Sequence, residues 1–206
     1  MKINTLAFGM AVLATSITLP GLAVAGSPTD WVQGTVDEVK NTMAIQDSGT
    51  ELTQAQVIEI SRVLGNRFSF REMARLALGK HWQQRSTQER TEFVQLFRRL
   101  MERSHLWSLS TQAGIEQRYV GERMEGDRTV VQALVQSEDG EIPIDYVLVP
   151  YNGSWKICDL NIDGVKLSQT YRAEFNRVIS KSSYKELVRK MSVKLEEVAM
   201  ETSSRR

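Results

Sequence analysis

Four strand-like runs follow one another between residues 114 and 162, and very short turns separate them. The runs cover residues 114–124, 128–137, 141–149 and 154–162. The last turn is Asn152-Gly153, a pair that tolerates the positive φ angles of a tight hairpin turn. Strands joined by such short turns pair with antiparallel neighbours. The sequence therefore predicts a four-stranded antiparallel meander.

The middle strands of this meander are apolar on both faces. Val130 and Leu134 alternate with Val131 and Val135 along residues 128–137. A sheet with one face in water alternates between apolar and polar side chains instead. We therefore expect both faces to be covered, at least in part. The alternation does not say which face meets a cavity.

Helices are predicted before the meander. Three Ser or Thr residues, each followed three positions later by Glu or Gln, stand at the head of apolar stripes. These capping boxes are Thr53–Gln56, Ser69–Glu72 and Ser86–Glu89. Gly65 and Gly79 are expected to end the first two of these helices. A further amphipathic helix is expected over residues 30–44.

The period of the sequence changes after the fourth strand. In residues 154–162, Ile157 and Asp159 should point to one face of a strand and Leu160 to the other. Gly164 allows a bend, and Leu167, Tyr171 and Phe175 then follow a helical period. Helices are expected over residues 167–179 and 184–199. The order of helices, meander and helices predicts a single α+β domain.

The first 25 residues have the pattern of a secretory signal peptide. Lys2 is their only charged residue, an apolar run extends from Leu6 to Leu19, and Ala23-Val24-Ala25 is an Ala-x-Ala cleavage signal. An uncleaved membrane anchor is the alternative. We expect a signal peptide at 1–25, one domain at 26–200 and a polar tail at 201–206.

Composition excludes several functions. The chain has 26 Lys and Arg against 25 Asp and Glu, so no nucleic-acid partner is expected. Its only cysteine, Cys158, cannot form an internal disulfide and is expected to be a small buried apolar residue. The two histidines, His81 and His105, are far apart in sequence, so no metal site is predicted.

Several motifs together resemble the MlaC / toluene-tolerance family of periplasmic phospholipid-binding proteins. They are RFSFREMARLALGKHW at 67–82, EFVQLF at 92–97, WKICD at 155–159, GVKL at 164–167 and YRAEF at 171–175. The resemblance extends over about residues 30–200. No single motif is unique to the family, but their order and spacing are specific.

The resemblance implies a nuclear-transport-factor-like α+β fold that encloses a hydrophobic cavity. It implies a periplasmic carrier with phospholipid as cargo and no other cofactor, and not an enzyme. Such a carrier shuttles lipid between an outer-membrane lipoprotein–porin complex and the inner-membrane MCE-domain protein of an ABC transporter. In this way it maintains outer-membrane lipid asymmetry.

Apolar and aromatic residues from both halves of the chain are the candidates for the lining of this cavity. Tyr146 and Tyr171 are expected to place their hydroxyl groups at its mouth. The candidates are Phe93, Phe97, Leu100, Trp107, Leu134, Ile144, Tyr146, Leu148, Ile162, Val165, Leu167, Tyr171 and Phe175.

Two other classes of function stay open. The first is a small-molecule isomerase on the same fold, which would recruit Asp145, Asp159 or Tyr146, although no acid–base pair or nucleophile motif is visible. The second is a periplasmic chaperone or lipoprotein carrier, which would also need an apolar groove. Arginines in and before the first motif, among them Arg62 and Arg71, are candidates for contact with a partner.

Overall fold

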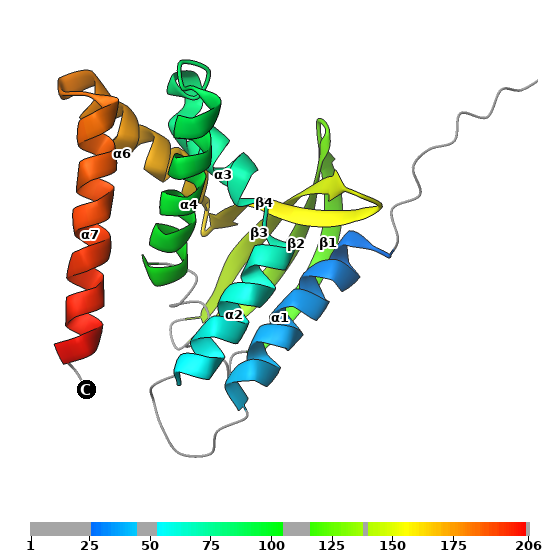
Figure 1. Cartoon of the computed structure of the whole chain (residues 1–206). Helices are drawn as coiled ribbons and strands as arrows, with labels where there is room; N and C mark the ends of the chain where they lie inside the picture. The colour runs from blue at the N-terminus through cyan, green and yellow to red at the C-terminus, as the bar shows by residue number, and fades with distance from the viewer. Residues whose placement is uncertain (1–25, 45–52, 105–115, 138–139, 205–206) are drawn as a thin grey trace, which may run out of the picture.

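The computed structural model describes residues 26–44, 53–104, 116–137 and 140–204. Helices come first, strands follow, and helices end the chain, which confirms the α+β order (Figure 1). The first helices are α1 (Pro28–Ala44), α2 (Gln54–Arg67), α3 (Phe70–Leu78), the 3-10 turn η1 (Gly79–His81) and α4 (Thr87–Ser104). The last are α6 (Leu167–Lys181) and α7 (Tyr184–Ser204), so α7 continues into the segment expected to be a polar tail.

Within the described residues, five strands form one antiparallel sheet in the order β1-β2-β3-β4-β5. They are β1 (Gln117–Glu125), β2 (Arg128–Ser137), β3 (Gly140–Tyr151), β4 (Ser154–Ile162) and β5 (Val165–Lys166). The prediction of four strands missed the fifth, β5. Its two residues are too few to show the alternation that identifies a strand. The Asn152-Gly153 turn is confirmed, with φ angles of 47° and 75°.

A bulge at Cys158 changes which side chains of β4 share a face. Val147 pairs with Asp159, but the next residue, Leu148, pairs with Ile157. One extra residue therefore shifts the alternation. Ile157 and Leu160 both join the main core, whereas Cys158 belongs to a separate cluster. The prediction that Ile157 and Leu160 lie on opposite faces is wrong for this reason.

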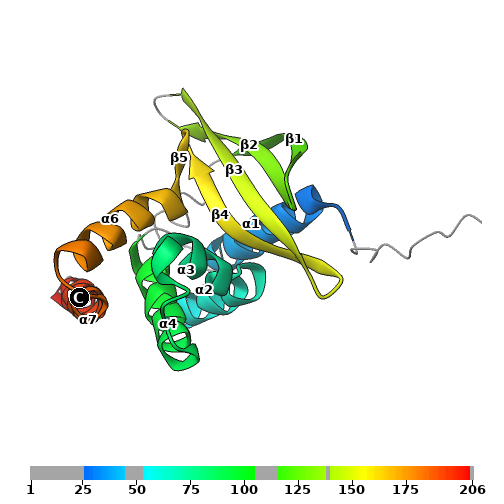
Figure 2. The same ribbon diagram turned by 90° about the horizontal axis from the view of Figure 1, so that it is seen from above.

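The helices cover one face of the sheet (Figure 2). Helix α1 contacts β1 and β2, and α2, α3 and α6 contact β4. Helix α7 packs on α4 and α6, on the side away from the sheet (Figure 1). On the opposite face, Val130, Val147 and Cys158 form a small buried cluster that includes no helix residue among those described. Both faces thus bury apolar side chains.

The helix ends follow the capping signals with one exception. Thr53 and Ser86 make complete capping boxes, while Ser69 only accepts a hydrogen bond from the backbone N–H of Glu72. Gly79 ends α3 with a φ of 53°. The prediction that Gly65 ends its helix is wrong, because α2 continues past this residue to Arg67.

Gly65 has a packing role instead of a terminating one. A Cβ atom at this position would lie 2.8 Å from Nη2 of Arg98. The same guanidinium group donates a hydrogen bond to the Ser61 carbonyl oxygen at 2.9 Å. The missing side chain thus lets α4 place an arginine directly against α2.

Both borders of the sheet carry irregular backbone. The chain between α2 and α3 runs beside β4, where Phe68 forms a parallel bridge with Ile157. The N–H of Ser69 also donates to the Ile157 carbonyl oxygen, at 2.8 Å. At the other border, the register of β1 shifts between Tyr119 and Gly121.

Candidate functional site

Most of the predicted lining residues lie in one apolar layer between the sheet and the helices. We use the name apolar layer for the main buried cluster, to which these residues belong. Its buried members from the predicted list are Phe93, Phe97, Leu100, Ile144, Tyr146, Leu148, Tyr171 and Phe175. Ile162 and Leu167 are half-buried and pack against them. Trp107 lies outside the described residues.

Two predicted lining residues lie elsewhere. Leu134 pairs with Pro143, one position out of phase with the pair Ala133 and Ile144. Side chains alternate along a strand, so Leu134 is on the face opposite the helices. Val165, in β5, is 60% exposed. The strand pairings thus show which residues of β2 and β3 face the helices.

An aromatic cluster joins α4 to α6 within the apolar layer. The ring of Phe97 meets that of Tyr171 edge to face, with 5.2 Å between the ring centres. Phe93 meets Phe175 in the same way at 5.8 Å. Burial raises the pKa of the Tyr171 hydroxyl group. Edge-to-face pairs of this kind fix the distance and the rotation of one helix relative to the other.

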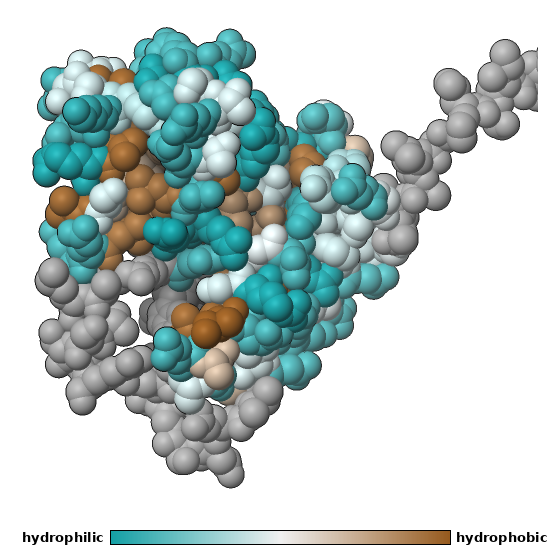
Figure 3. All heavy atoms as spheres, in the orientation of Figure 1, coloured by the Kyte–Doolittle hydropathy of each residue, from teal (hydrophilic) through white to brown (hydrophobic). Residues whose placement is uncertain are grey.

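Hydrophobic side chains also gather at the surface between α4 and α7 (Figure 3). Tyr184 and Leu195 of α7 are half-buried and pack against the apolar layer. Leu187 and Met191 of the same helix are buried. Helix α7 thus extends the apolar packing outward from α4.

The sequence reasoning missed a polar pair inside the apolar layer. The Tyr146 hydroxyl group donates to Oε1 of Gln117 across 3.2 Å. Burial raises the pKa of Tyr146 to about 12. Tyr119 is half-buried beside this pair, and burial, then Tyr146 and Asp37, raise the pKa of its phenol as well. Side chains two positions apart on a strand share a face, so Gln117 could have been found from its spacing to Tyr119.

The two aspartates considered for catalysis make structural contacts on the other side of the sheet. Asp145 lies 3.1 Å from the Arg123 guanidinium group and accepts a hydrogen bond from Asn161 at 3.2 Å. Asp159 is buried, and it accepts hydrogen bonds from the N–H groups of Leu160 and Ser168 at 3.0 Å each. The Ser168 hydroxyl group donates to it as well. Asp159 thereby holds the first turn of α6 onto β4.

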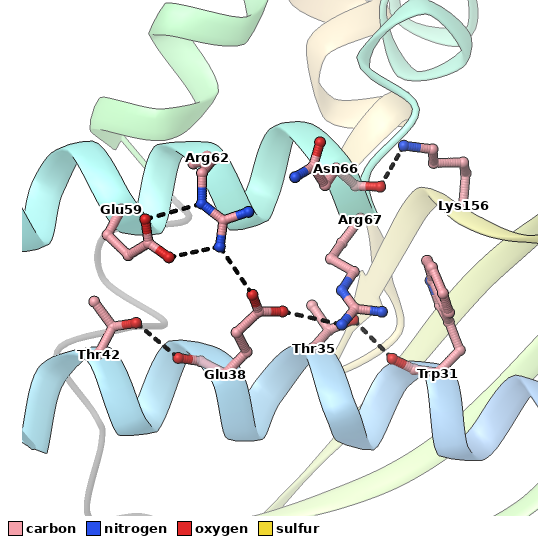
Figure 4. A network of polar contacts seen from close by, with 9 residues as sticks. All are labelled: Trp31, Thr35, Glu38, Thr42, Glu59, Arg62, Asn66, Arg67 and Lys156. Carbon is pink, nitrogen blue, oxygen red and sulfur yellow. Dashed lines mark hydrogen bonds and ion pairs between the residues drawn. The ribbon is translucent and has the colours of Figure 1, made fainter.

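Several of the arginines considered for partner contact are already paired within the chain (Figure 4). Arg62 bonds to Glu59 at 2.6 Å and to Glu38 at 3.2 Å. Arg67 bonds to the same Glu38 at 2.9 Å and lies 4.3 Å from the centre of the Trp31 ring. These contacts join α1 to α2. Arg71 is exposed on α3, its guanidinium carbon lies 5.7 Å from the centre of the Trp82 ring, and it makes no ion pair within the described residues.

No group of acidic, histidine or cysteine side chains within the described part of the chain could hold a metal ion. His81 is buried, with Nε2 3.0 Å from Oδ1 of Asn176, so it links η1 to α6. Cys158 is buried, and burial raises the pKa of its thiol to about 12. No helix in the described ranges has the length and apolar character needed to cross a bilayer.

The order of helices, five-stranded antiparallel sheet and C-terminal helices is that of the nuclear-transport-factor-like class of α+β folds. The MlaC protein family matches residues 33–193 of this chain. The chain therefore belongs to the MlaC family.

A solved structure has the same fold. It is the phospholipid-binding protein from Ralstonia solanacearum, determined in complex with a phospholipid. The TM-score is 0.75 at 23% sequence identity, and the match covers 84% of this chain and 99% of that one. A comparison with curated proteins gave no match.

Proposed function

We propose that this protein is a periplasmic phospholipid carrier that holds acyl chains between the sheet and the helices. The observation that carries the proposal is the apolar layer, in which residues from α4, β3 and α6 form one buried cluster. Membership of the MlaC family supports it. So does the neighbour of the same fold, whose structure contains a phospholipid.

The energetics explain why such a carrier needs an apolar interior. Exposing acyl chains to water costs about 0.8 kcal/mol per methylene group. A two-chain lipid with ~30 methylene groups would thus cost ~24 kcal/mol to move through water unprotected. Protein side chains of matched hydrophobicity remove most of this cost. The carrier then needs no energy source of its own, and direction comes from the proteins at which it loads and unloads.

Lipid content is the direct test. The purified protein is extracted into organic solvent and the extract is analysed by mass spectrometry. A diacyl phospholipid at near-stoichiometric yield is the expected result. Acylated peptide would favour a lipoprotein carrier instead, and an extract without lipid from protein freshly isolated from its own cells would refute the proposal.

A matched pair of variants tests where the tails lie. Ile144→Trp adds volume on the helix-covered face, whereas Leu134→Trp adds the same kind of side chain on the opposite face. Ile144→Trp should lower the yield of bound lipid, and Leu134→Trp should leave it unchanged. Circular dichroism confirms that both variants are folded. Equal lipid yields from the two would place the tails somewhere other than the apolar layer.

The shuttle role requires partners at both membranes. We propose that lipid passes between an outer-membrane lipoprotein–porin complex and the MCE-domain protein of an inner-membrane ABC transporter, which maintains outer-membrane lipid asymmetry. The test is transfer of labelled phospholipid to each purified partner. Arg71→Glu should weaken docking while lipid content is retained, because this arginine is exposed and is not used in an internal ion pair. Export is tested by N-terminal sequencing, which should begin at Gly26.

A further inference from the structure

Tyr146 and Gln117 contact each other across an intervening strand. Tyr146 is in β3 and pairs with Val131, while Gln117 is in β1 and pairs with Val135. Residue 133 lies midway between those two positions on β2, and it is alanine. Its methyl group leaves room for the phenol ring to cross β2 and donate to Oε1 of Gln117.

This contact leaves the other end of the Gln117 amide without a partner. Nε2 is buried, and nothing in the described part of the chain accepts a hydrogen bond from it. A buried donor without an acceptor costs free energy, so proteins rarely retain one. Because the Tyr146 hydroxyl group donates to Oε1, Nε2 is the open position of this amide.

The pair also lies where the buried part of the sheet meets its half-buried part. Val131 and Tyr146 are buried, whereas Gln117, Val135 and Ile142 further along are half-buried. A lipid with its tails on the buried part would cross this boundary where its chains join the glycerol. The atoms found at that junction in a diacyl lipid are the ester groups.

The surrounding charge favours a neutral acceptor at this position. The Asp37 carboxylate acts on the Tyr119 phenol beside the pair and helps raise its pKa, after burial and Tyr146. The same negative charge would repel a phosphate group. An ester carbonyl oxygen carries no charge and accepts a hydrogen bond from an amide.

We propose that Nε2 of Gln117 donates a hydrogen bond to an acyl-ester carbonyl oxygen of the bound phospholipid. Tyr146 is the positioning residue that orients the amide. This inference rests on the proposed function and adds to it a preference for ester-linked over ether-linked lipid. The specificity lies in the linkage of the tails and not in the headgroup.

The experiment compares two lipids that differ only in that linkage. Delipidated protein is incubated with vesicles containing equal amounts of dipalmitoyl phosphatidylglycerol and its dihexadecyl ether analogue. The ratio of the two lipids bound is measured by mass spectrometry. One hydrogen bond of ordinary strength predicts that the wild-type protein prefers the ester by about three- to tenfold.

Gln117→Leu should bring this ratio close to one, while total lipid binding is retained. Gln132→Leu is the matched control, since Gln132 pairs with Gly121 and Asp145 on the opposite face of the sheet. This control should keep the wild-type ratio. If Gln117→Leu does not fold, the double variant with Tyr146→Phe replaces it, because removing both partners leaves no unpaired polar group.

Equal binding of ester and ether lipid by the wild-type protein would overturn the inference and leave the carrier function intact. A preference that persists in Gln117→Leu would overturn it too. Failure of the wild-type protein to bind either lipid would overturn the inference together with the proposed function.

Discussion

Replacing Asp159 should destabilise the protein through the junction of β4 and α6. Asp159 is 4% exposed, and its carboxylate accepts hydrogen bonds from the N–H groups of Leu160 and Ser168 and from the Ser168 hydroxyl group. Asp159→Ala leaves these donors buried without an acceptor. Each orphaned donor costs about 1–3 kcal/mol, and relief of the buried charge offsets part of the sum. We expect a loss of about 3–4 kcal/mol in the free energy of unfolding.

Asp159→Asn should cost much less. Both backbone N–H groups bond to Oδ1, which an asparagine retains, and only the contact between Oδ2 and the Ser168 hydroxyl group has to change. A loss of about 1–2 kcal/mol is expected. The difference between the two variants thus separates the loss of the acceptor from the loss of the charge.

The assay is urea unfolding followed by far-ultraviolet circular dichroism, with linear extrapolation to water. Asp127→Ala is the control, since the Asp127 side chain is 94% exposed and 3.9 Å from the Arg128 guanidinium group. It should change the free energy of unfolding by less than about 0.5 kcal/mol. A value for Asp159→Ala within about 1 kcal/mol of this control would show that the hydrogen bonds to α6 contribute little.

Three further predictions test local features. Gly34 lies in open space on α1, so Gly34→Ala should stabilise the protein by about 0.5–1 kcal/mol. Gly65→Ala should give no gain, because its new methyl group displaces the Arg98 guanidinium group. Equal gains in urea unfolding would contradict this. Thr53→Ala removes a complete capping box and should cost about 1 kcal/mol in the same assay. Since burial raises the pKa of Cys158 to about 12, its thiol should react with iodoacetamide about a thousandfold more slowly in native than in unfolded protein. A cysteine introduced by Val165→Cys, at a 60% exposed position, should react readily in the native state, and fast native labelling of Cys158 itself would refute its burial.

Local signals in the sequence located the elements well. The Thr53 and Ser86 boxes mark true helix starts because capping depends on side chains only three residues apart. Asn152-Gly153 marks a true hairpin for the same local reason. The prediction that Gly65 ends a helix failed because the sequence does not distinguish such a glycine from one that leaves room for a distant side chain.

The sequence predicted which residues share a face of the sheet only where side chains alternate regularly along a strand. The bulge at Cys158 put Ile157 and Leu160 on the same face, and no local pattern in β4 announces it. Leu134 was misplaced because β2 is apolar on both faces, so only its pairing with Pro143 reveals its direction. Gln117 was missed because a search for an apolar lining passes over a polar residue.

The irregular backbone at the two sides of the sheet bears on how the protein avoids aggregation. An outermost strand with a continuous row of free N–H and C=O groups is a template on which a second molecule can add a strand. Here Phe68 and Ser69 occupy part of the open side of β4, and β5 pairs with its end. On β1, the shifted register beyond Tyr119 interrupts the row of free groups. Neither side therefore offers a long regular template for a strand from a second molecule.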